Sequence, residues 1–462
     1  MIKRNLLLGS AMFCAFAAFA DTDMSIYQGK DVSVRVASSG STIKFSGTNV
    51  ILGEETLQKV DSIVLKHYVS VKFENDKVTV SNPFDSLDVN VDGTNVEINS
   101  RYTAREIKYK FSGKCSDGSV MFSSLYKSNF EFDNLDLTSN GVNPPVYILS
   151  KKKTEVHLVG KNSLKNSAND TVAATMRAKG QFEFKGDGSL DITSVKGHGI
   201  QSSDYVEVKS GTINVNAESD GIHVNDYYLQ LGGEVNINTK ADGVDVGEGY
   251  FQIDGGSLVV KSSADEARGV RCSFLADKLN SGKVDFNGGD VDIQLSGKSS
   301  RGVKADKIVT VDGGDVLIVM GGATKMIDID YTYTCGIKSD DAIDVKSGNL
   351  VVICQTSAHN SRCLQGYSVS MTGGRTVLFQ FGVNADVDAK KSYVVKTDEK
   401  FSVKEKSNLY VTYDDEEVKP FKIGTTMFVD GSSVVSGDRD TYFDTHTELP
   451  EAYWNPYDKY AK

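Results

Sequence analysis

A short phrase punctuated by glycine recurs through the middle of this sequence and constrains the fold more than any other feature. One half of the phrase places a glycine before an aliphatic residue, at 197–202, 219–224, 241–246, 267–272, 300–305 and 334–339. The other half occurs at 210–215, 232–237, 255–260, 288–293, 313–318 and 347–352. Self-similarity at a period of roughly 20 to 50 residues is typical of folds that stack one structural unit on the next.

The period and the pattern within it indicate the type of unit. Gly199, Gly221 and Gly243 lie 22 residues apart, and later copies, up to Gly336, are spaced more widely. The phrases contain short alternating runs such as 213–215, without helical spacing, and glycine permits tight turns between them. About three strands per 22-residue coil predict an all-β, right-handed parallel β-helix with loops inserted in its later coils.

Strand alternation assigns side chains to the interior or to the surface. The residue after the repeat glycine is aliphatic, as in Ile222, Val244 and Val270, and we expect it to point inward. In the second half of the phrase, the late copies also place apolar residues outward, including Leu317 and Val351. Exposure of such an apolar patch to water is unfavourable, so we expect the C-terminal tail to cover the late coils.

The remaining segments complete the expected organisation. Residues 1–20 combine a basic start, an apolar centre and an Ala-Phe-Ala end, which predicts a secretory signal peptide cut before Asp21. We expect a small β domain or N-terminal cap at 21–105, the β-helix at 106–382, and a C-terminal β segment and tail at 383–462. The mature protein is therefore predicted to be secreted or on the cell surface, with the periplasm as an alternative.

Charge limits the partners. With 51 Lys and Arg against 62 Asp and Glu, the formal net charge is −11. This balance disfavours nucleic acid, because phosphate binding needs a basic surface. An acidic polysaccharide stays possible, because a local column of basic residues or bound cations can reverse the sign.

The cysteines do not form a disulfide scaffold. Five remain once Cys14 is removed with the signal peptide, an odd number that is thinly spread. Cys272 takes an inward position held in earlier coils by Val224, so we expect a small buried hydrophobe there. Cys335 and Cys363 lie one coil apart and form a candidate disulfide in an exported protein.

The region from about 106 to 380 resembles a known family. The resemblance is carried by the order of "FSG…SDGS", "VYILSKKKTEVHLVGKNSLKN" and "GDGSLDIT…GHGIQSSD…SGTINVNAESDGIHV". These segments are similar to the bacterial carbohydrate-binding β-helix family, once catalogued as a domain of unknown function. The resemblance implies a fold like that of pectate lyases. It also implies calcium-associated binding of plant cell-wall polysaccharide, notably polygalacturonate and, as a further candidate, cellulose, without demonstrated cleavage.

Three aspartates are candidate calcium ligands. Asp220 and Asp242 occupy the same turn of consecutive coils, and Asp245 follows closely. Stacked carboxylates repel unless a cation lies between them, and calcium takes six to eight oxygen ligands. The alternative is that Asp-Gly is ordinary turn chemistry. The later coils depart from the family pattern, with Arg268 and Arg301 before the glycine, so calcium is not expected there.

Basic residues on two neighbouring outward columns form a more specific candidate, a binding site for an acidic polysaccharide. They are Arg268, Arg271, Arg301, Lys304 and Lys338, here called the basic strip. A chain of carboxylated sugars could lie along such a strip and accept bidentate arginine contacts. The alternative is a solvated face whose cations pair with local acids such as Asp306 and Asp340.

Two further groups carry weaker signals. His223 stands alone in its column, and no His, Cys and Asp spacing indicates zinc, so we expect it to be exposed. Tyr205, Tyr227, Tyr228 and Tyr250 lie near the starts of consecutive coils. Aromatic rings suit sugar faces, but packing at the corners of the coils is the favoured interpretation.

Three classes of function follow. The favoured one is a non-catalytic binder of acidic plant polysaccharide. The second is a calcium-dependent lyase of the pectate type, which needs an unprotonated base; Arg271, Lys304 and Lys338 are the candidates. The third is a surface adhesin or structural repeat protein without a sugar site.

Overall fold

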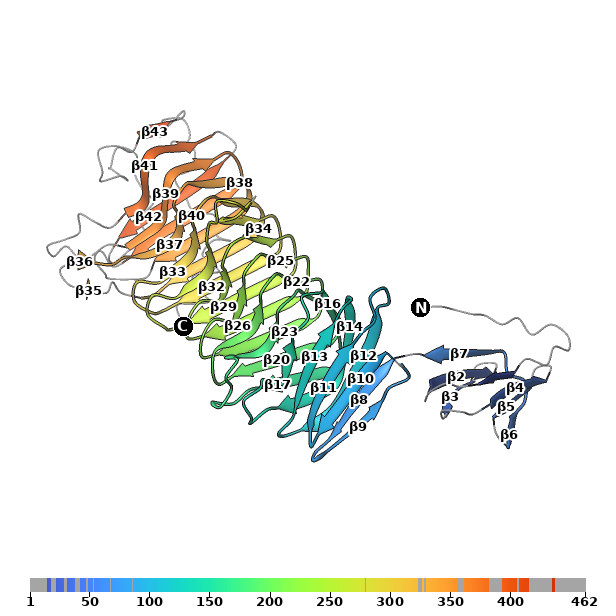
Figure 1. Cartoon of the computed structure of the whole chain (residues 1–462). Coiled ribbons are helices and arrows are strands. Elements are labelled where there is room, and N and C mark those ends of the chain that lie inside the picture. Colours follow the sequence, from blue (N-terminus) through green and yellow to red (C-terminus); the bar gives the residue numbers. More distant parts are fainter. Residues whose placement is uncertain are drawn as a thin grey trace.

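All secondary-structure elements that the computed structural model describes are β-strands (Figure 1). The described residues are 15–17, 22–28, 31–37, 42–46, 49–52, 54–66, 68–84, 86–278, 280–322, 326–327, 330–354, 361–381, 393–404, 407–414 and 434–436. Within these ranges there is no helix with the length and hydropathy needed to cross a membrane.

The first strands form two small antiparallel sheets. One contains β1 (Ala15–Ala17), β4 (Thr42–Ser46), β5 (Asn49–Leu52) and β6 (Glu55–Leu57), and the other contains β2 (Thr22–Gln28), β3 (Asp31–Ala37) and β7 (Ser62–Lys66). No described strand of either sheet pairs with the large sheet that follows. Apart from β1, the predicted signal peptide lies outside the described residues.

The large sheet begins with two hairpins, and it starts earlier than expected. The hairpins are β8 (Val69–Glu74) with β9 (Lys77–Ser81), and β10 (Leu87–Asp92) with β11 (Asn95–Ser100). β8 pairs in parallel with β12 (Ile107–Cys115), and β11 pairs in parallel with β13 (Ser119–Ser124). The predicted boundary at 105 is therefore wrong for the sheet, because the hairpins supply backbone partners to its first strands. They occupy an edge that would otherwise be open.

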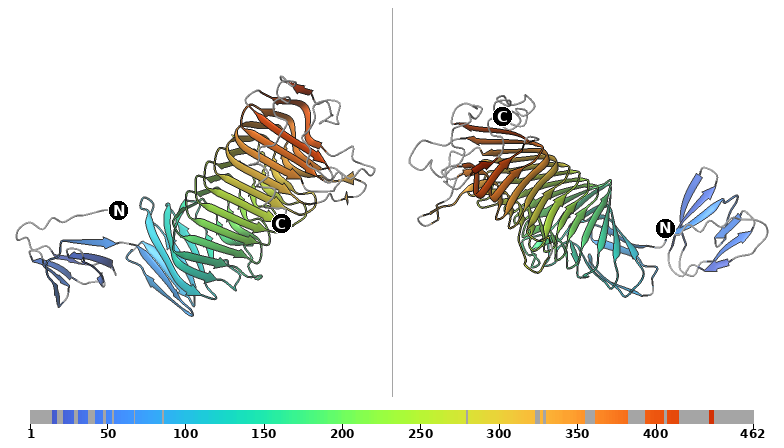
Figure 2. Two further views of the ribbon diagram at one scale, coloured as in Figure 1. Left: turned by 180° about the vertical axis from the view of Figure 1, so that it is seen from behind. Right: turned by 90° about the horizontal axis from the view of Figure 1, so that it is seen from above.

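Three successive strands make one repeat of the large sheet. From β15 to β31, each strand pairs in parallel with the third strand after it. The chain therefore returns to its starting position displaced by one strand spacing, roughly 4.8 Å. Figure 2 shows the resulting regular array from behind and from above. The repeat places corresponding strands in three stacks.

The first stack carries the glycine-aliphatic half of the sequence phrase. It contains β15 (Val146–Ile148), β18 (Ala174–Ala178), β21 (His198–Ser202), β24 (Ile222–Val224), β27 (Val244–Val246), β30 (Arg268–Cys272), β33 (Arg301–Ala305), β37 (Thr334–Ser339), and the starts of β39 (Ser361–Met371) and β41 (Tyr393–Val403).

The second stack follows it in each repeat. It contains the start of β14 (Ser128–Thr138), β16 (Thr154–Val159), β19 (Phe182–Gly186), β22 (Val206–Val208), β25 (Tyr228–Gln230), β28 (Tyr250–Ile253), β31 (Lys283–Phe286), the starts of β34 (Val309–Met320) and β38 (Ala342–Cys354), and β43 (Val434–Ser436) against the end of β41.

The third stack carries the other half of the phrase. It contains β17 (Lys161–Lys165), β20 (Ser189–Ser194), β23 (Thr212–Ala217), β26 (Glu234–Thr239), β29 (Ser257–Ser262), β32 (Asp290–Leu295), the ends of β34 and β38, β40 (Arg375–Phe381) and β42 (Asn408–Asp414). Between β34 and β37, β35 (Met326–Ile327) and β36 (Asp330–Tyr331) form a separate antiparallel pair.

The core lies between the stacks, and its columns follow the predicted register. Ile222 is aligned with Val244, Val244 with Val270, and Val270 with Val303. All four side chains are fully buried. Cys272 is also fully buried, as predicted. Burial of these aliphatic columns fixes the register, because a shift by one residue would expose every one of them.

The repeat glycines of the first stack are needed for a reason other than the tight turn that we expected. They have no positive φ, whereas glycines in the other half-phrase, such as Gly233, do. A Cβ built on Gly243 would lie 2.4 Å from Cγ1 of Val260 and 2.5 Å from the Gly269 carbonyl oxygen. Each repeat glycine therefore leaves room for an inward aliphatic side chain of the third stack.

The late repeats continue past the predicted end at 382. β41 and β42 extend the parallel pairing to Asp414, so this boundary also moves. Val351, predicted to face outward, and Val377, which is aligned with it, are 6% and 0% exposed. The tail expected to cover them lies largely outside the described residues.

The predicted disulfide does not form. All five described cysteines are free and buried. Cys335 is aligned with Arg301 and Arg362, in a column of surface side chains. Cys363 takes the place of a repeat glycine, where a side chain points into the core, and it belongs to the core cluster while Cys335 does not. The two cysteines therefore occupy different columns of the strand stack.

Candidate functional site

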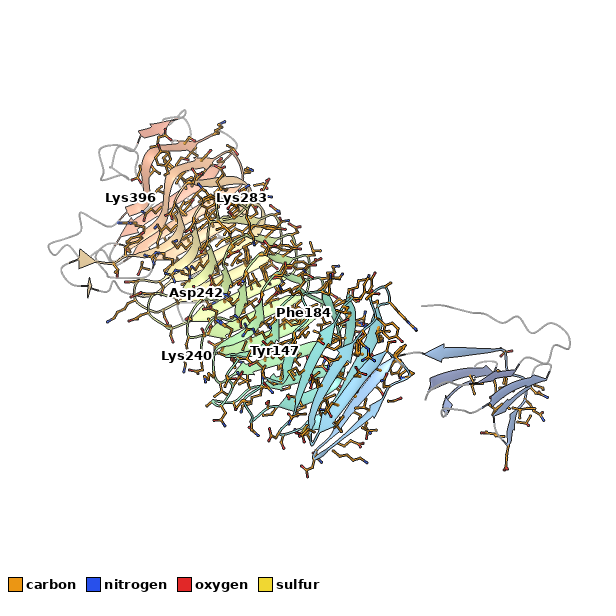
Figure 3. All side chains as sticks on the ribbon, in the orientation of Figure 1. Tyr147, Phe184, Lys240, Asp242, Lys283 and Lys396 are labelled. Carbon is orange, nitrogen blue, oxygen red and sulfur yellow. The ribbon has the colours of Figure 1, made fainter. Side chains whose placement is uncertain are left out.

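The outer surface of the first stack carries two columns of chemically reactive side chains. The residues before the repeat glycines form one column: His198, Asp220, Asp242, Arg268, Arg301, Cys335 and Arg362. The residues two places after the glycines form the other: Gln201, His223, Asp245, Arg271, Lys304, Lys338, Gln365 and Lys396. Figure 3 labels Asp242 and Lys396 among the side chains along the sheet. One sheet surface thus changes from histidine and aspartate to arginine and lysine along its length.

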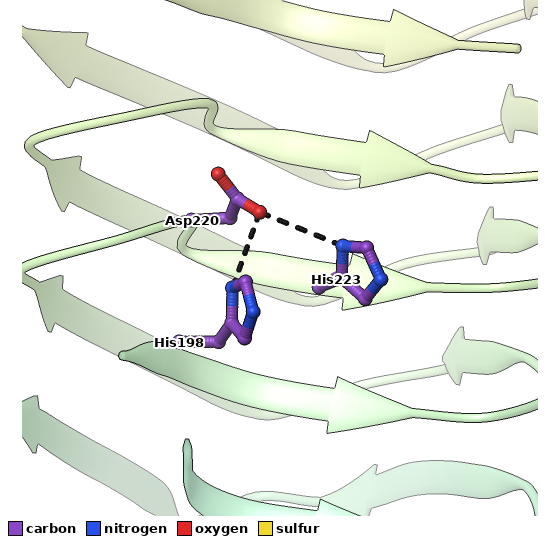
Figure 4. A group of neighbouring side chains, drawn as sticks. All are labelled: His198, Asp220 and His223. Atoms are coloured by element: carbon purple, nitrogen blue, oxygen red, sulfur yellow. Dashed lines mark ion pairs between the residues drawn. The ribbon is translucent and has the colours of Figure 1, made fainter. Parts of the chain in front are cut away.

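Two histidines converge on one carboxylate at the first end (Figure 4). Oδ2 of Asp220 lies 3.1 Å from Nδ1 of His198 and 3.5 Å from Nδ1 of His223. Nδ1 of His223 also lies 3.0 Å from Oδ2 of Asp245. The two imidazole rings are stacked, with centroids 4.8 Å apart. We call these four residues the histidine–aspartate cluster.

The contacts within the cluster change its protonation. Burial alone would raise the pKa of Asp220, but hydrogen bonds with His198 and His223 outweigh burial and lower that pKa. The pKa of His223 is raised to about 9, mainly by its hydrogen bonds with Asp220 and then Asp245. His223 is therefore a partly buried imidazolium at neutral pH, and the expectation of a lone exposed histidine was wrong.

His198 was missed in the sequence. It lies one residue before Gly199, at the offset that Asp220 and Asp242 occupy in the next two repeats. Extending the aspartate column backward by one repeat would have found it. The sequence contained this information, because every repeat places the residue before the repeat glycine on the same surface.

The three predicted calcium ligands do not form one oxygen-lined site. The backbone N–H of Asp242 donates to Oδ1 of Asp220 over 3.1 Å, and the N–H of Arg268 donates to Oδ1 of Asp242 over 2.8 Å. Burial raises the pKa of Asp242 to about 6, against the opposing effect of Arg268. These carboxylates thus accept hydrogen bonds from backbone N–H groups or contact histidines. The set does not fit calcium, which prefers six to eight oxygen ligands.

A different trio is compact. Among the described residues, the one group of three potential metal-binding side chains with all donor atoms within 4.8 Å of one another is His198, Asp220 and His223. Two of its three donors are nitrogen atoms. Nitrogen-rich sites suit transition metals better than calcium.

The basic strip residues are aligned on consecutive strands, and four of the five cations face carboxylates, among them the Asp306 and Asp340 pairs of the alternative interpretation. Nζ of Lys304 lies 2.5 Å from Asp306, and Nζ of Lys338 lies 3.1 Å from Asp340. The arginine contacts are longer: Arg268 reaches Asp242 at 3.5 Å, and Nε of Arg271 lies 3.6 Å from Oδ1 of Asp245. These lengths leave most guanidinium donors uncommitted to the carboxylates.

An aromatic ring links the strip to a residue that the sequence did not single out. The guanidinium groups of Arg301 and Arg362 lie 4.9 and 3.9 Å from the centroid of the Tyr333 ring. Such contacts hold a guanidinium in place without consuming its hydrogen-bond donors. Arg362 could have been found as the next member of the Arg301 column, one repeat beyond Cys335.

The predicted tyrosines form a stacked ladder on the second stack. The Tyr205 and Tyr227 rings have centroids 4.4 Å apart, and those of Tyr227 and Tyr250 are 4.9 Å apart, nearly parallel in both pairs. Tyr228 is buried against Phe251. A sugar stacks on a ring face, and the inner faces of this ladder cover one another. The favoured interpretation, packing at the corners, accounts for the geometry.

Comparison with known proteins finds a similar family and a similar curated protein. Residues 92–318 match the family model described as carbohydrate-binding domain-containing protein. A carbohydrate-binding domain-containing protein of Acetivibrio thermocellus is 26% identical over 159 residues, which are 32% of this chain and 52% of that protein. The chain thus spans about half the length of this curated relative.

A solved structure is also similar. It is a polysaccharide lyase-like protein from C. thermocellum, solved as a gadolinium derivative, with 18% sequence identity and a TM-score of 0.41. The match covers 60% of this chain and 96% of that one. The family match spans strands of all three stacks from β11 to β34. Residues 92–318 of this chain are therefore similar to the carbohydrate-binding domain family.

Proposed function

We propose that this protein is an exported, non-catalytic binder of acidic plant polysaccharide, built as a right-handed parallel β-helix, and that the basic strip is its binding surface. The parallel pairing of each strand with the third strand after it supports the architecture. The signal-peptide pattern of 1–20 supports export. The match of 92–318 to the carbohydrate-binding domain model supports the ligand class.

The observation that carries the proposal is the alignment of cations on consecutive strands. Arg271 is aligned with Lys304, and Lys304 with Lys338. Their spacing along the stack is one strand separation, roughly 4.8 Å. A polymer with a carboxylate on each sugar presents charge at a regular short repeat, and a rigid row of cations can follow it without reorganisation.

The arginines of the basic strip have N–H groups that can donate hydrogen bonds to such a ligand. Arg268 and Arg271 make long contacts with Asp242 and Asp245, and Arg301 is held by a ring face. A guanidinium has five N–H donors in a fork that matches a carboxylate. Side-chain exposures of 27% for Arg268 and 39% for Arg271 leave these groups accessible yet partly desolvated, which strengthens a charged hydrogen bond.

The lyase alternative has less support from the strip. Proton abstraction beside a uronate needs an unprotonated base. Burial alone would lower the pKa of Lys338, but Tyr333 and Asp340 outweigh it and raise that pKa. The lysine most enclosed by its neighbours is thus held in its protonated form, which suits binding.

Affinity electrophoresis in polygalacturonate tests the proposal. The triple variant Arg271→Ala, Lys304→Ala, Lys338→Ala should lose retention by at least about tenfold in apparent affinity, because three charge-assisted contacts disappear. The matched control removes three cations from elsewhere, in Lys114→Ala, Lys127→Ala, Lys240→Ala; two of these are more than half exposed. It should keep the retention of the parent chain.

The other arms of the experiment separate the alternatives. A gel of neutral polysaccharide tests whether retention depends on the charge of the sugar. A run with a calcium chelator tests whether calcium bridges the protein and the sugar. Ultraviolet absorbance of unsaturated uronate products, followed over a long incubation, reports cleavage. Equal loss of retention in both triple variants would show only a net-charge effect, and would overturn the strip as the binding surface.

A further inference from the structure

We propose that the histidine–aspartate cluster binds one divalent transition-metal ion of the zinc type, with His198, Asp220, His223 and Asp245 as ligands. The cluster lies on β21, β24 and β27, in the repeats before the basic strip. The inference does not depend on the sugar-binding proposal, because none of its four metal ligands belongs to the basic strip and the bound species is a metal ion.

The donor atoms of three residues of the cluster, His198, Asp220 and His223, are about as close as atoms bound to one ion. Zinc is bound at about 2.0–2.1 Å in a tetrahedron, so its ligand atoms lie roughly 3.3–3.4 Å apart. Oδ2 of Asp220 lies 3.1 and 3.5 Å from the two histidine Nδ1 atoms. Oδ2 of Asp245 lies 3.0 Å from Nδ1 of His223. His198, Asp220 and His223 thus have all donor atoms within 4.8 Å of one another, and rotation of the Asp245 side chain, which lies against His223, would bring the fourth ligand to the same centre.

The donor set selects the class of metal. Two imidazole nitrogens and two carboxylate oxygens suit zinc and its first-row neighbours, whereas calcium takes oxygen donors and six to eight of them. The two carboxylates also balance the charge of a divalent ion. The cluster thus differs in chemistry from the calcium site that the family resemblance implies.

Neighbouring groups hold the ligands in place. The N–H of Asp242 donates to Oδ1 of Asp220 over 3.1 Å, which turns Oδ2 toward the two imidazoles. Nε of Arg271 lies 3.6 Å from Oδ1 of Asp245, whereas His223 contacts Oδ2. Outer hydrogen bonds such as the one from the Asp242 N–H orient ligands in metal sites and raise affinity. The ligands lie on or directly beside paired strands, so little order has to be gained on binding.

The cluster is also accessible to an ion. The side chains of His198 and His223 are 21% and 23% exposed, and those of Asp220 and Asp245 are 13% and 9% exposed. This partial burial desolvates the ligands while leaving a path from the surface. Without metal, the same atoms contact one another, so binding would replace these His–Asp contacts with contacts to the ion.

Cobalt titration of the metal-free full-length chain tests the site, because tetrahedral cobalt absorbs visible light and replaces zinc in its sites. We expect one cobalt per chain, displaced by zinc and not by calcium, with a rise in the thermal unfolding midpoint. His198→Ala and His223→Ala should each weaken cobalt binding at least about tenfold. His157→Ala is the matched control, since His157 lies on β16, 3.9 Å from Glu131 and outside the cluster, and it should bind normally.

Folding of each variant is checked by far-ultraviolet circular dichroism, and Asp245→Asn provides a nearly isosteric change should an alanine variant fail to fold. Loss of the tetrahedral signal in Asp245→Asn, with the fold retained, supports the site. Cobalt binding that survives in both histidine variants, or a folded parent chain that binds no cobalt, would overturn it. Retention in polygalacturonate is measured on the same variants, so failure of the metal site and failure of the sugar site are distinguishable.

Discussion

Strands β21 to β27 and strands β30 to β37 occupy the same stack, yet their outer surfaces have opposite character. The earlier strands carry Asp220, Asp242 and Asp245 beside two histidines, and the later ones carry the basic strip. Their inward residues are interchangeable, since Val244, Val270 and Val303 fill one buried column.

The comparison separates two demands on the sequence. Inward positions must be aliphatic or glycine, because packing fixes the register. Outward positions do not set the register, and they are therefore free to take the charges that a ligand requires. The two regions meet where Arg271 faces Asp245 and Arg268 faces Asp242, so opposite charges compensate each other at the boundary.

The prediction with the largest expected effect tests whether the cores of the two regions pack alike. Gly243→Ala and Gly269→Ala should each destabilise the protein by about 3 kcal/mol, because both Cβ atoms would overpack a filled core. On Gly269, a Cβ would lie 2.4 Å from Cγ2 of Ile293. Urea midpoints measure the change.

The control for this pair is Gly141→Ala. The nearest atom to a Cβ there is the Ser139 hydroxyl oxygen at 4.0 Å, so the change should stay within about 0.5 kcal/mol. A large difference between Gly243→Ala and Gly269→Ala would contradict the claim that both repeats pack alike.

A smaller effect concerns the acid response of the basic region. Burial alone would raise the pKa of Asp306, but hydrogen bonds from Lys304 and the Phe274 N–H outweigh it and lower that pKa. The resulting stability is present above the unfolded value of about 3.8 and is lost as pH falls through the lowered pKa. Asp306→Asn should remove about 1 kcal/mol at pH 7 and flatten this acid limb.

Unfolding midpoints between pH 2 and pH 7 check this prediction. Asp136→Asn is the control, because its partner Lys114 is 71% exposed and the pair should contribute little. An acid limb of equal slope in Asp306→Asn and the parent chain would show that Asp306 does not contribute.

The smallest effect concerns two thiols of the later region, on β30 and β37. Burial raises the pKa of Cys272 and of Cys335 to about 12, so both are expected to be inert in the folded state. Ellman's reagent should label them only after unfolding, and a reducing agent should leave the thermal midpoint unchanged. A midpoint that drops on reduction would reveal a disulfide between two of the buried cysteines.

Much of the fold could be predicted from the sequence, and the site only in part. The columns of Ile222 and of Arg271 followed from counting offsets within a repeat. The partners of these side chains did not, because a repeat places residues next to one another without specifying which rotamers meet. His223 and the supposed calcium ligands illustrate this, since their contacts run between columns and between repeats.

The sequence by itself determined the period, the inward aliphatic columns and the order of charges along the first stack, because strand alternation and glycine spacing are local properties. Only the tertiary structure decided where the large sheet begins and ends, why the repeat glycines are needed, and that two histidines share the carboxylate of Asp220. Those features depend on atoms about one strand spacing apart in space and some 22 to 26 residues apart in the chain.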